Sequence, residues 1–459
     1  MFYFAVCTLV SIVFGCLLVW CCWPGQDRPW LLVALVSLPV GLSLTSAMFF
    51  LWLVISGGKG NWYPMVECGV LVATLSVAWK FRRDIKTVSQ WGVPFSAKSL
   101  FAILVVLAAV LPVSIAAFMR TLVNPWGRWD AWARINVKAH FLFGGGDGWT
   151  WIFESPHIAH NDYPLLLAAT VARAWSWMGV SPLFAPQAVS LLWGLWSVLI
   201  LYGLVAWLRG VNMAAIATLA YLTFTPLWFF ASIQYSDIAL ACYLLLGCAM
   251  MYAAEKYSAG ASRFAGLAGF FAGSAAWCKN EGIVFLALVL LWWAGLVMSG
   301  RICRWRSASV WLFGGLASVG CAVVVLKLFY ASSPGVLAGR AFTDLWALVV
   351  DSERHLIILG KFVEGLVRYW YGWPLLLVSL AFILKIFAVK AVIDHVWTLS
   401  CVFFMMASYY FVYVITSNDL VWHLNTTINR LVMQLWPAFI LGIVLLFSCE
   451  DKTSNNLKN

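Results

Sequence analysis

An aspartate and two basic residues recur at helical spacing in one short segment of the chain. Asp130, Arg134 and Lys138 are four residues apart, so on an α-helix they share one face. Trp129 and Trp132 lie toward a different face. A carboxylate in such a segment can take a proton from a hydroxyl group, and cations beside it can bind an anion. The simpler alternative is a salt bridge between Asp130 and Arg134 on a solvated face.

The residues before this segment place it at a membrane surface. Residues 99–119 form an apolar run long enough to cross a bilayer, and the tryptophans follow directly. We therefore expect an amphipathic interfacial helix, with its aromatic side toward lipid and the Asp130 carboxylate presented to water.

A second cluster lies between residues 154 and 165. His157, His160 and Asp162 fall within six residues at the mouth of an apolar segment. Imidazole and carboxylate groups at this spacing can ligate a divalent metal ion or hold a phosphate or sugar hydroxyls. The alternative is an N-cap cluster, with Pro164 in the first helical turn. A metal ion therefore stays optional, and no other cofactor is indicated.

Two acidic positions mark helix starts farther along the chain. Lys279 and Glu281 lie between two apolar runs, where they can bind substrate groups or neutralise each other in a turn. Asp237 opens another apolar run; an ionisable residue there is functional or paired, or it caps the helix dipole.

The last cluster precedes the C-terminal apolar run. His423 and Arg430 frame a polar stretch, and a guanidinium at residue 430 can hold two oxygens of a phosphate in a fixed fork. Alternatively, Arg430 only extends to the membrane surface.

The composition determines the class of protein. Hydrophobic residues make up 63% of the 459 residues and charged residues 10%, and the mean hydropathy is +0.90. A soluble domain of this length is excluded, and the alternating pattern of a membrane barrel is absent. We expect an all-α, polytopic transmembrane protein with about 13 to 14 spans. The net charge of +11 requires no nucleic acid, because basic loops and a phosphate-binding face account for it.

Basic loops orient these spans. Residues 80–98, 300–307 and 385–390 are basic and predicted to be cytoplasmic, which makes the 120–161 and 331–368 loops extracytoplasmic. The number of apolar segments between the first two basic loops is odd where an even number is needed. We expect the irregular segment to be 162–178 or 183–208, as a re-entrant or split pair. Residues 449–459 are expected to form a disordered cytoplasmic tail.

The order of the clusters resembles that of the GT-C superfamily of membrane glycosyltransferases. The chain is most similar to the branch of protein O-mannosyltransferases and lipid A aminoarabinose transferases. The resemblance covers residues 98–448, after additional helices in residues 1–97. The motifs that carry it are Asp130 in the first large loop, His160-Asn161-Asp162-Tyr163-Pro164-Leu165, Tyr235-Ser236-Asp237-Ile238, Lys279-Asn280-Glu281-Gly282, and His423-Leu424-Asn425-Thr426-Thr427 followed by Arg430-Leu431.

The resemblance implies a fold and a reaction. It implies a GT-C-like fold and transfer of a sugar, with inversion, from a polyprenyl-phosphate donor to a glycan, lipid or protein acceptor. Asp130 corresponds to the general base. Lys279, Arg430, His160, His423 and Arg134 are expected at the donor phosphate, and Asp162, His157, Asp237 and Glu281 at the sugar or a metal ion.

The expected location is a bacterial inner membrane, with the active site on the extracytoplasmic face. One alternative is a transporter or flippase for lipid-linked sugars, which would need charges in mid-span and usually an internal repeat. A second is an O-antigen polymerase or ligase. The charges of this chain gather at span ends, which favours the transferase, but the sequence names neither sugar nor acceptor.

Overall fold

The computed structural model is helical throughout the part of the chain that it describes, and that part contains no strand. It describes residues 1–24, 29–81, 97–155, 158, 160–224, 226–302, 304–331, 342–370 and 389–446. The predicted cytoplasmic tail and most of the 80–98 loop lie outside these residues.

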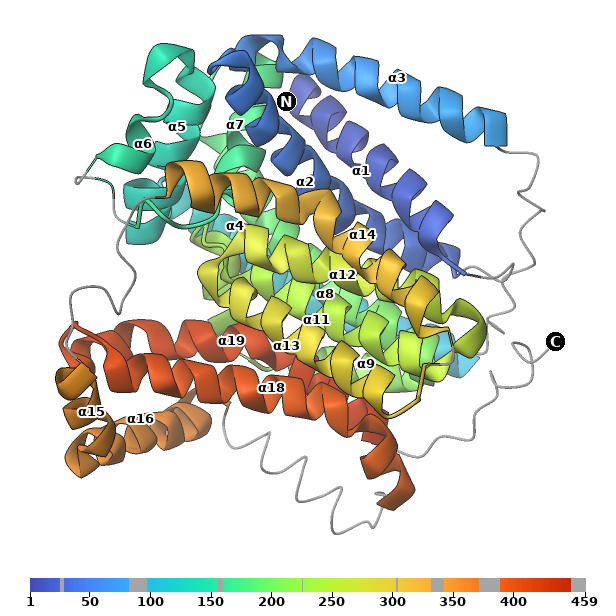
Figure 1. Ribbon diagram of the computed structural model, residues 1–459, viewed down its shortest axis with the longest axis vertical. Helices are drawn as coiled ribbons and strands as arrows, with labels where there is room; N and C mark the ends of the chain where they lie inside the picture. The colour runs from blue at the N-terminus through green and yellow to red at the C-terminus, as the bar shows by residue number, and fades with distance from the viewer. Residues whose placement is uncertain are drawn as a thin grey trace.

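The helices, in chain order and as labelled in Figure 1, are α1 (Phe2–Cys22), α2 (Trp30–Ser56), η1 (Gly60–Trp62), α3 (Tyr63–Phe81), α4 (Ala97–Val123), η3 (Ala131–Asn136), α5 (Val137–Gly144), η4 (Gly146–Gly148), α6 (Trp151–Glu154), α7 (Leu166–Met178), α8 (Phe184–Arg209), α9 (Val211–Leu222), α10 (Pro226–Ser232), α11 (Asp237–Lys256), η5 (Ser258–Gly260), α12 (Ala261–Cys278), α13 (Asn280–Met298), α14 (Trp305–Val325), η6 (Leu326–Tyr330), α15 (Phe342–Val350), α16 (Ser352–Trp370), α18 (Val389–Ile415) and α19 (Leu420–Leu446).

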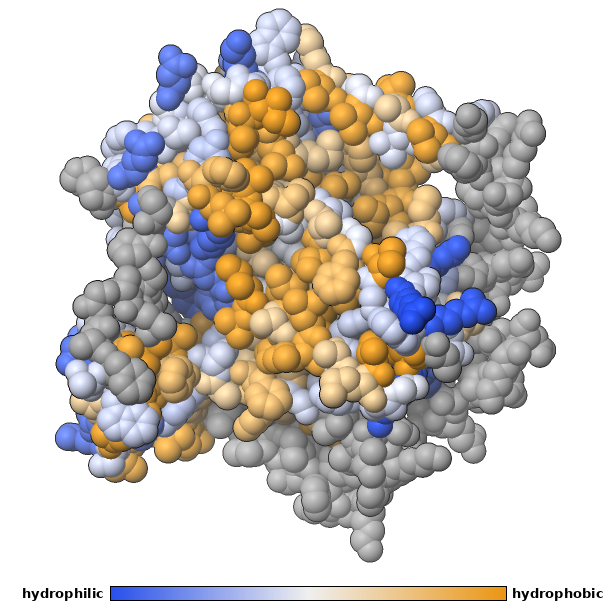
Figure 2. Space-filling model, viewed as in Figure 1, coloured by the Kyte–Doolittle hydropathy of each residue, from blue (hydrophilic) through white to orange (hydrophobic). Residues whose placement is uncertain are grey.

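The prediction of a multi-pass helical membrane protein is confirmed. Among the described residues, ten helices are long and apolar enough to cross a bilayer. Their outer faces carry large apolar side chains: Leu104, Leu107 and Leu111 of α4 are each more than half exposed. Hydrophobic side chains also cover much of the face seen in Figure 2. Such a surface suits lipid, because apolar groups exposed to water over this area would be strongly unfavourable.

Helix α11 forms the centre of the bundle. Its apolar window is completely buried, and it packs against α8, α12, α13, α18 and α19 (Figure 1). Helix α12 is equally enclosed and lies against α14 along small residues. A Cβ atom on Gly269 would come within 2.0 Å of the Leu312 carbonyl oxygen, so glycine is required for this close approach. Small residues thus bring these helices close enough to pack without lipid between them.

The predicted apolar segments 162–178 and 213–231 differ from single crossings. Residues 162–178 contain only the 13-residue helix α7, which is too short to span a bilayer alone. The expected break in 183–208 is wrong, because α8 is one unbroken helix of 26 residues. The break lies instead in 213–231, where α9 and α10 meet at an angle of 76°. The predicted span 369–386 lies almost wholly outside the described residues.

The 120–161 loop folds against the bundle with its tryptophans outward and the Asp130 side chain turned into the protein. Trp126, Trp129 and Trp132 are each at least half exposed, whereas the Asp130 side chain is buried. The expectation that this carboxylate is presented to water is therefore wrong. The physical reason is that the face bearing Asp130 and Arg134 meets partners of opposite charge inside the protein, and the aromatic side chains remain outside.

Candidate functional site

Asp130 stands at the start of η3, a π-helical turn, and is held through one carboxylate oxygen. Its Oδ2 atom accepts hydrogen bonds from Nη2 of Arg134 at 3.1 Å and Nη2 of Arg430 at 2.6 Å. Its backbone N–H donates to the Tyr235 hydroxyl at 3.2 Å. Within the described residues, the Oδ1 atom has no hydrogen-bond partner. The carboxylate is therefore fixed on one side and open on the other.

Asp237, at the start of α11, has both oxygens occupied. Oδ1 accepts hydrogen bonds from Lys279 Nζ at 2.9 Å and from Gln434 Nε2 at 2.6 Å, and Oδ2 accepts one from Arg430 Nε at 3.2 Å. The side chain is fully buried. Buried carboxylates persist as charged groups only with such partners. Asp237 is thus the internal counter-ion that joins α11 to α19 and to the α12–α13 junction.

Glu281 pairs with Lys279 through one oxygen only. Glu281 Oε1 lies 2.8 Å from Lys279 Nζ, whereas Oε2 is buried and has no hydrogen-bond partner in the described structure. Burial alone would lower the pKa of Lys279, but the nearby carboxylates of Asp237 and Glu281 outweigh it and raise that pKa above its ordinary value. Lys279 is therefore a permanent cation, and Glu281 keeps one acceptor oxygen for another group.

The turn at residues 160–163 adds Asp162 and Tyr163 to the site. The Asp162 carboxylate accepts a hydrogen bond from Asn280 Nδ2 at 2.9 Å and lies 3.5 Å from Lys327 Nζ. The guanidinium of Arg134 lies over the Tyr163 ring, 4.6 Å from its centre. Burial raises the pKa of the Tyr163 hydroxyl to about 12, so it stays protonated. His160 has a left-handed backbone (φ 52°), which is uncommon for a residue other than glycine.

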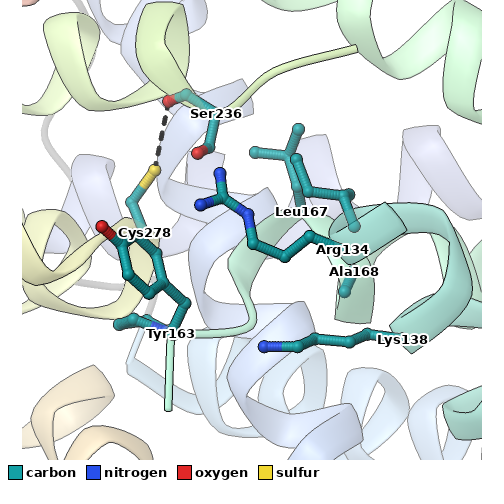
Figure 3. Close-up of a pocket in the computed structure, with 9 residues that line it drawn as sticks. Arg134, Lys138, Tyr163, Leu167, Ala168, Ser236 and Cys278 are labelled. Atoms are coloured by element: carbon teal, nitrogen blue, oxygen red, sulfur yellow. Dashed lines mark hydrogen bonds between the residues drawn. The ribbon is translucent and has the colours of Figure 1, made fainter. Parts of the chain in front are cut away.

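A small pocket opens beside Arg134. Its walls include Arg134, Lys138, Tyr163, Ser236 and Cys278, and Figure 3 shows both basic side chains reaching into it from the same side. Lys138 is almost fully buried, which lowers the pKa of its ammonium to about 7, with a further contribution from the nearby Arg134 charge. Figure 2 shows hydrophilic side chains in a hollow between α6 and α15, so this side of the bundle is polar.

The structure brings together most of the residues predicted for the site. Ion pairs link six of them into one network: Asp130, Arg134, Asp237, Lys279, Glu281 and Arg430. Asp162 lies at the edge of this network, next in the chain to Tyr163, whose ring contacts Arg134. Two of the histidines predicted for the site, His423 and His160, lie beside this network rather than in it. His423 bonds to the Thr416 hydroxyl at 2.9 Å, and the His160 side chain is exposed beside the Tyr163 ring. His157 lies outside the described residues.

The optional metal site gains no support from the side chains described. No group of three or more His, Cys, Asp or Glu side chains arranged to hold a metal ion occurs in that part of the chain. Asp162, the best candidate ligand, is instead bound to an amide and an ammonium group.

Sequence reasoning missed several residues that build the site. Gln434 could have been found, because it follows Arg430 by one helical turn and so shares its face. Tyr235 and Asn280 lie within the motifs quoted for the resemblance, and Lys327 is a charge within an apolar run, but nothing local shows that these residues reach Asp130 or Asp162.

Comparisons with protein-family models, curated proteins and solved structures found no match for this chain.

Proposed function

We propose that this protein is a membrane glycosyltransferase that uses a polyprenyl-phosphate-linked sugar, with Asp130 as its general base. The observation that carries the proposal is the one-sided fixation of Asp130. Two guanidinium groups hold Oδ2, whereas Oδ1 has no partner among the described residues. A general base needs such an arrangement, because the carboxylate must be oriented by fixed groups and keep one oxygen for the proton.

The charge balance supports an anionic substrate. The network and the adjoining turn contain five basic side chains, Arg134, Lys138, Lys279, Lys327 and Arg430. They contain four acidic ones, Asp130, Asp162, Asp237 and Glu281, so the basic groups exceed the acidic ones by one positive charge when the Lys138 ammonium, whose pKa is about 7, is protonated. A phosphate that enters this region would neutralise the excess and would be attracted by groups held in place before it binds.

We assign a role to each side chain from the hydrogen-bonding groups that it does not use within the protein. Arg430 uses Nε and Nη2 for Asp237 and Asp130, so Nη1 is its group available for a phosphate oxygen. Arg134 uses Nη2 for Asp130 and lines the small pocket, so its remaining N–H groups are proposed for the phosphate as well. Glu281 Oε2 can accept a bond from a sugar hydroxyl, whereas Asp237 has no acceptor left and is assigned a structural role. His160, His423 and Asp162 remain proposed contacts at the edge of the site.

The proposed reaction is a displacement at the anomeric carbon. The oxygen of an acceptor hydroxyl attacks that carbon while Asp130 Oδ1 takes the hydroxyl proton. The bond between the anomeric carbon and the phosphate oxygen breaks, and the lipid phosphate leaves with the electron pair. Arg430 and Arg134 stabilise the negative charge that develops on this phosphate. The products are the inverted glycoside, polyprenyl phosphate and a protonated Asp130, which returns its proton to water.

The test is transfer by the purified protein in lipid nanodiscs. A set of synthetic polyprenyl-phosphate sugars would be incubated with glycolipid, peptide and glycan acceptors, and the product analysed for its anomeric configuration. We expect one donor to be consumed with inversion. Asp147, an exposed acid of the same loop, supplies a matched control through Asp147→Asn. Donor that crosses the bilayer without cleavage would indicate the transporter instead, and no transfer with any pair would contradict the proposal.

We place the active site on the extracytoplasmic face of a bacterial inner membrane. A cysteine introduced at position 147 tests the orientation. We expect it to be labelled by a membrane-impermeant thiol reagent that is added to cells whose inner membrane is intact.

A further inference from the structure

Three successive backbone carbonyl groups of the 160–163 turn are bound by two lysine side chains. Lys138 Nζ lies 2.6 Å from the His160 oxygen and 3.3 Å from the Asn161 oxygen. Lys327 Nζ lies 2.7 Å from the Asp162 oxygen. The two lysines come from different parts of the chain, α5 and the π-helical turn η6. An ammonium group binds a carbonyl more strongly than a neutral donor does, so the turn is held from both sides.

Neither lysine is explained by pairing with an acid alone. Lys138 is 2% exposed, and no carboxylate of the described residues lies within ion-pair distance of it. Burying an ammonium group without a counter-ion is unfavourable, so its presence needs a compensating role. Lys327 divides its bonds between the Asp162 carbonyl and the Asn280 side chain at 2.8 Å, with the Asp162 carboxylate farther away.

The turn itself is strained and is connected to the site. A left-handed residue other than glycine is unfavourable and persists only where surrounding groups impose it. His160 is such a residue. Three residues later, the Tyr163 ring packs against the guanidinium of Arg134, which in turn binds Asp130. A path of direct contacts therefore runs from the lysines through the turn to Asp130.

From this geometry we infer that Lys138 and Lys327 are positioning residues, which hold the 160–163 turn so that Tyr163 keeps Arg134 on Asp130. Within the described structure, neither lysine forms a hydrogen bond or ion pair with Asp130 or with its guanidinium partners. Both π-helical turns of the described chain, η3 and η6, contribute to this arrangement, the first with Arg134 and the second with Lys327. Irregular turns of this kind occur frequently at functional sites, where they aim a side chain that a regular helix would not.

Amide hydrogen exchange tests the inference without any assay of activity. Lys327→Met keeps the length of the side chain and removes the ammonium group. We expect exchange to increase about tenfold or more in residues 160–165, as expected when local opening becomes easier. It should also increase in residues 130–136 of η3. Among the described residues, Lys327 forms no hydrogen bond or ion pair with η3, so the second effect must pass through the turn. Lys138→Met should affect the same two segments.

The control is Lys361→Met, which removes an exposed lysine paired with Glu364 and should leave both segments unchanged. Unchanged exchange of the turn in both lysine variants, or a loosened turn with unchanged exchange in η3, would overturn the inference. Its catalytic consequence rests on the proposed function: Lys327→Met should lower kcat about tenfold or more and change the donor KM little. Wild-type protein without transfer activity would reject that function, whereas the exchange results would still decide whether the lysines position Arg134.

Discussion

Arg430 Nη2 lies 2.6 Å from Asp130 Oδ2, so the last described helix binds the residue that directly precedes η3. The same guanidinium also bonds to Asp237 of α11 and lies 4.6 Å from the centre of the Tyr235 ring. Arg430 therefore connects α19, α11 and the 120–161 loop at one point. The position of Asp130 depends on how α19 packs, although the two are far apart in the chain.

Asp130→Asn should abolish the proposed reaction while keeping the fold. The amide has the size of the carboxylate but cannot accept a proton, so we expect transfer to fall at least ~10²-fold. Initial rates of donor consumption measure the effect. The Asp147→Asn control should retain wild-type rates, and substantial activity in Asp130→Asn would mean that Asp130 serves only as an ion-pair partner.

Arg430→Met should destabilise the protein, contrary to the sequence-based view that residue 430 lies at a span end facing the surface. Its removal leaves Asp130 and Asp237 each with one cation fewer in a buried site, so we expect a loss of about 3 kcal/mol. Thermal unfolding in detergent measures it. Arg430→Lys should lose less, because an ammonium can still reach one carboxylate. A melting temperature equal to wild type in Arg430→Met would show that the network adds nothing to stability.

Asp237 and Glu281 should respond differently to the same change. Asp237→Asn removes the charge that Lys279 and Arg430 share, so stability should fall by about 3 kcal/mol or more. Glu281→Gln retains an acceptor oxygen for Lys279, so we expect stability near wild type but a higher KM for the donor sugar. Parallel unfolding and kinetic measurements on the two variants check this pattern, and equal losses of stability would refute the division of roles.

Lys138 should make stability depend on pH. The pKa of its ammonium is about 7 in the folded protein, below the ordinary value of 10.5. Between these values the unfolded chain binds the extra proton, so stability should rise with pH from about 7 to 10, by on the order of 1 kcal/mol per pH unit. Comparing unfolding of wild type and Lys138→Met from pH 7 to 9.5 isolates this contribution. An identical slope in both proteins would contradict it.

The class of fold was predictable because its cause is local. Apolar runs of bilayer length and basic loops are visible in the sequence, and most of the resulting helices lie within a few residues of the predicted segments. The break between α9 and α10 was missed, although Pro226 begins α10 and a proline disfavours a helical conformation in the residue before it. The proline marks where a helix can end, but the angle between the two helices depends on the helices packed against them.

The members of the site were partly predictable, but their connections were not. Charges in an apolar chain are rare, so Asp130, Asp237, Lys279 and Arg430 could be singled out individually. The sequence also allowed each a structural role: a local salt bridge for Asp130, a helix cap for Asp237, a turn with Glu281 for Lys279 and an interfacial side chain for Arg430. The structure gives Asp130 its local partner Arg134 together with the distant Arg430, and only packing of α19 against α11 determines that second contact.

The burial of α11 has a consequence for how the protein is assembled in the membrane. Chains enter the bilayer from their N-terminal end, so α11 is inserted before α13 and α19. At that stage Asp237 has neither the ammonium of Lys279 in place nor the guanidinium of Arg430. A lone carboxylate in this position favours the headgroup region or the protonated form. The ion network is therefore completed only when α19 packs against α11. A chain truncated before residue 420 should leave α11 at a different depth in the bilayer from that in the full-length protein.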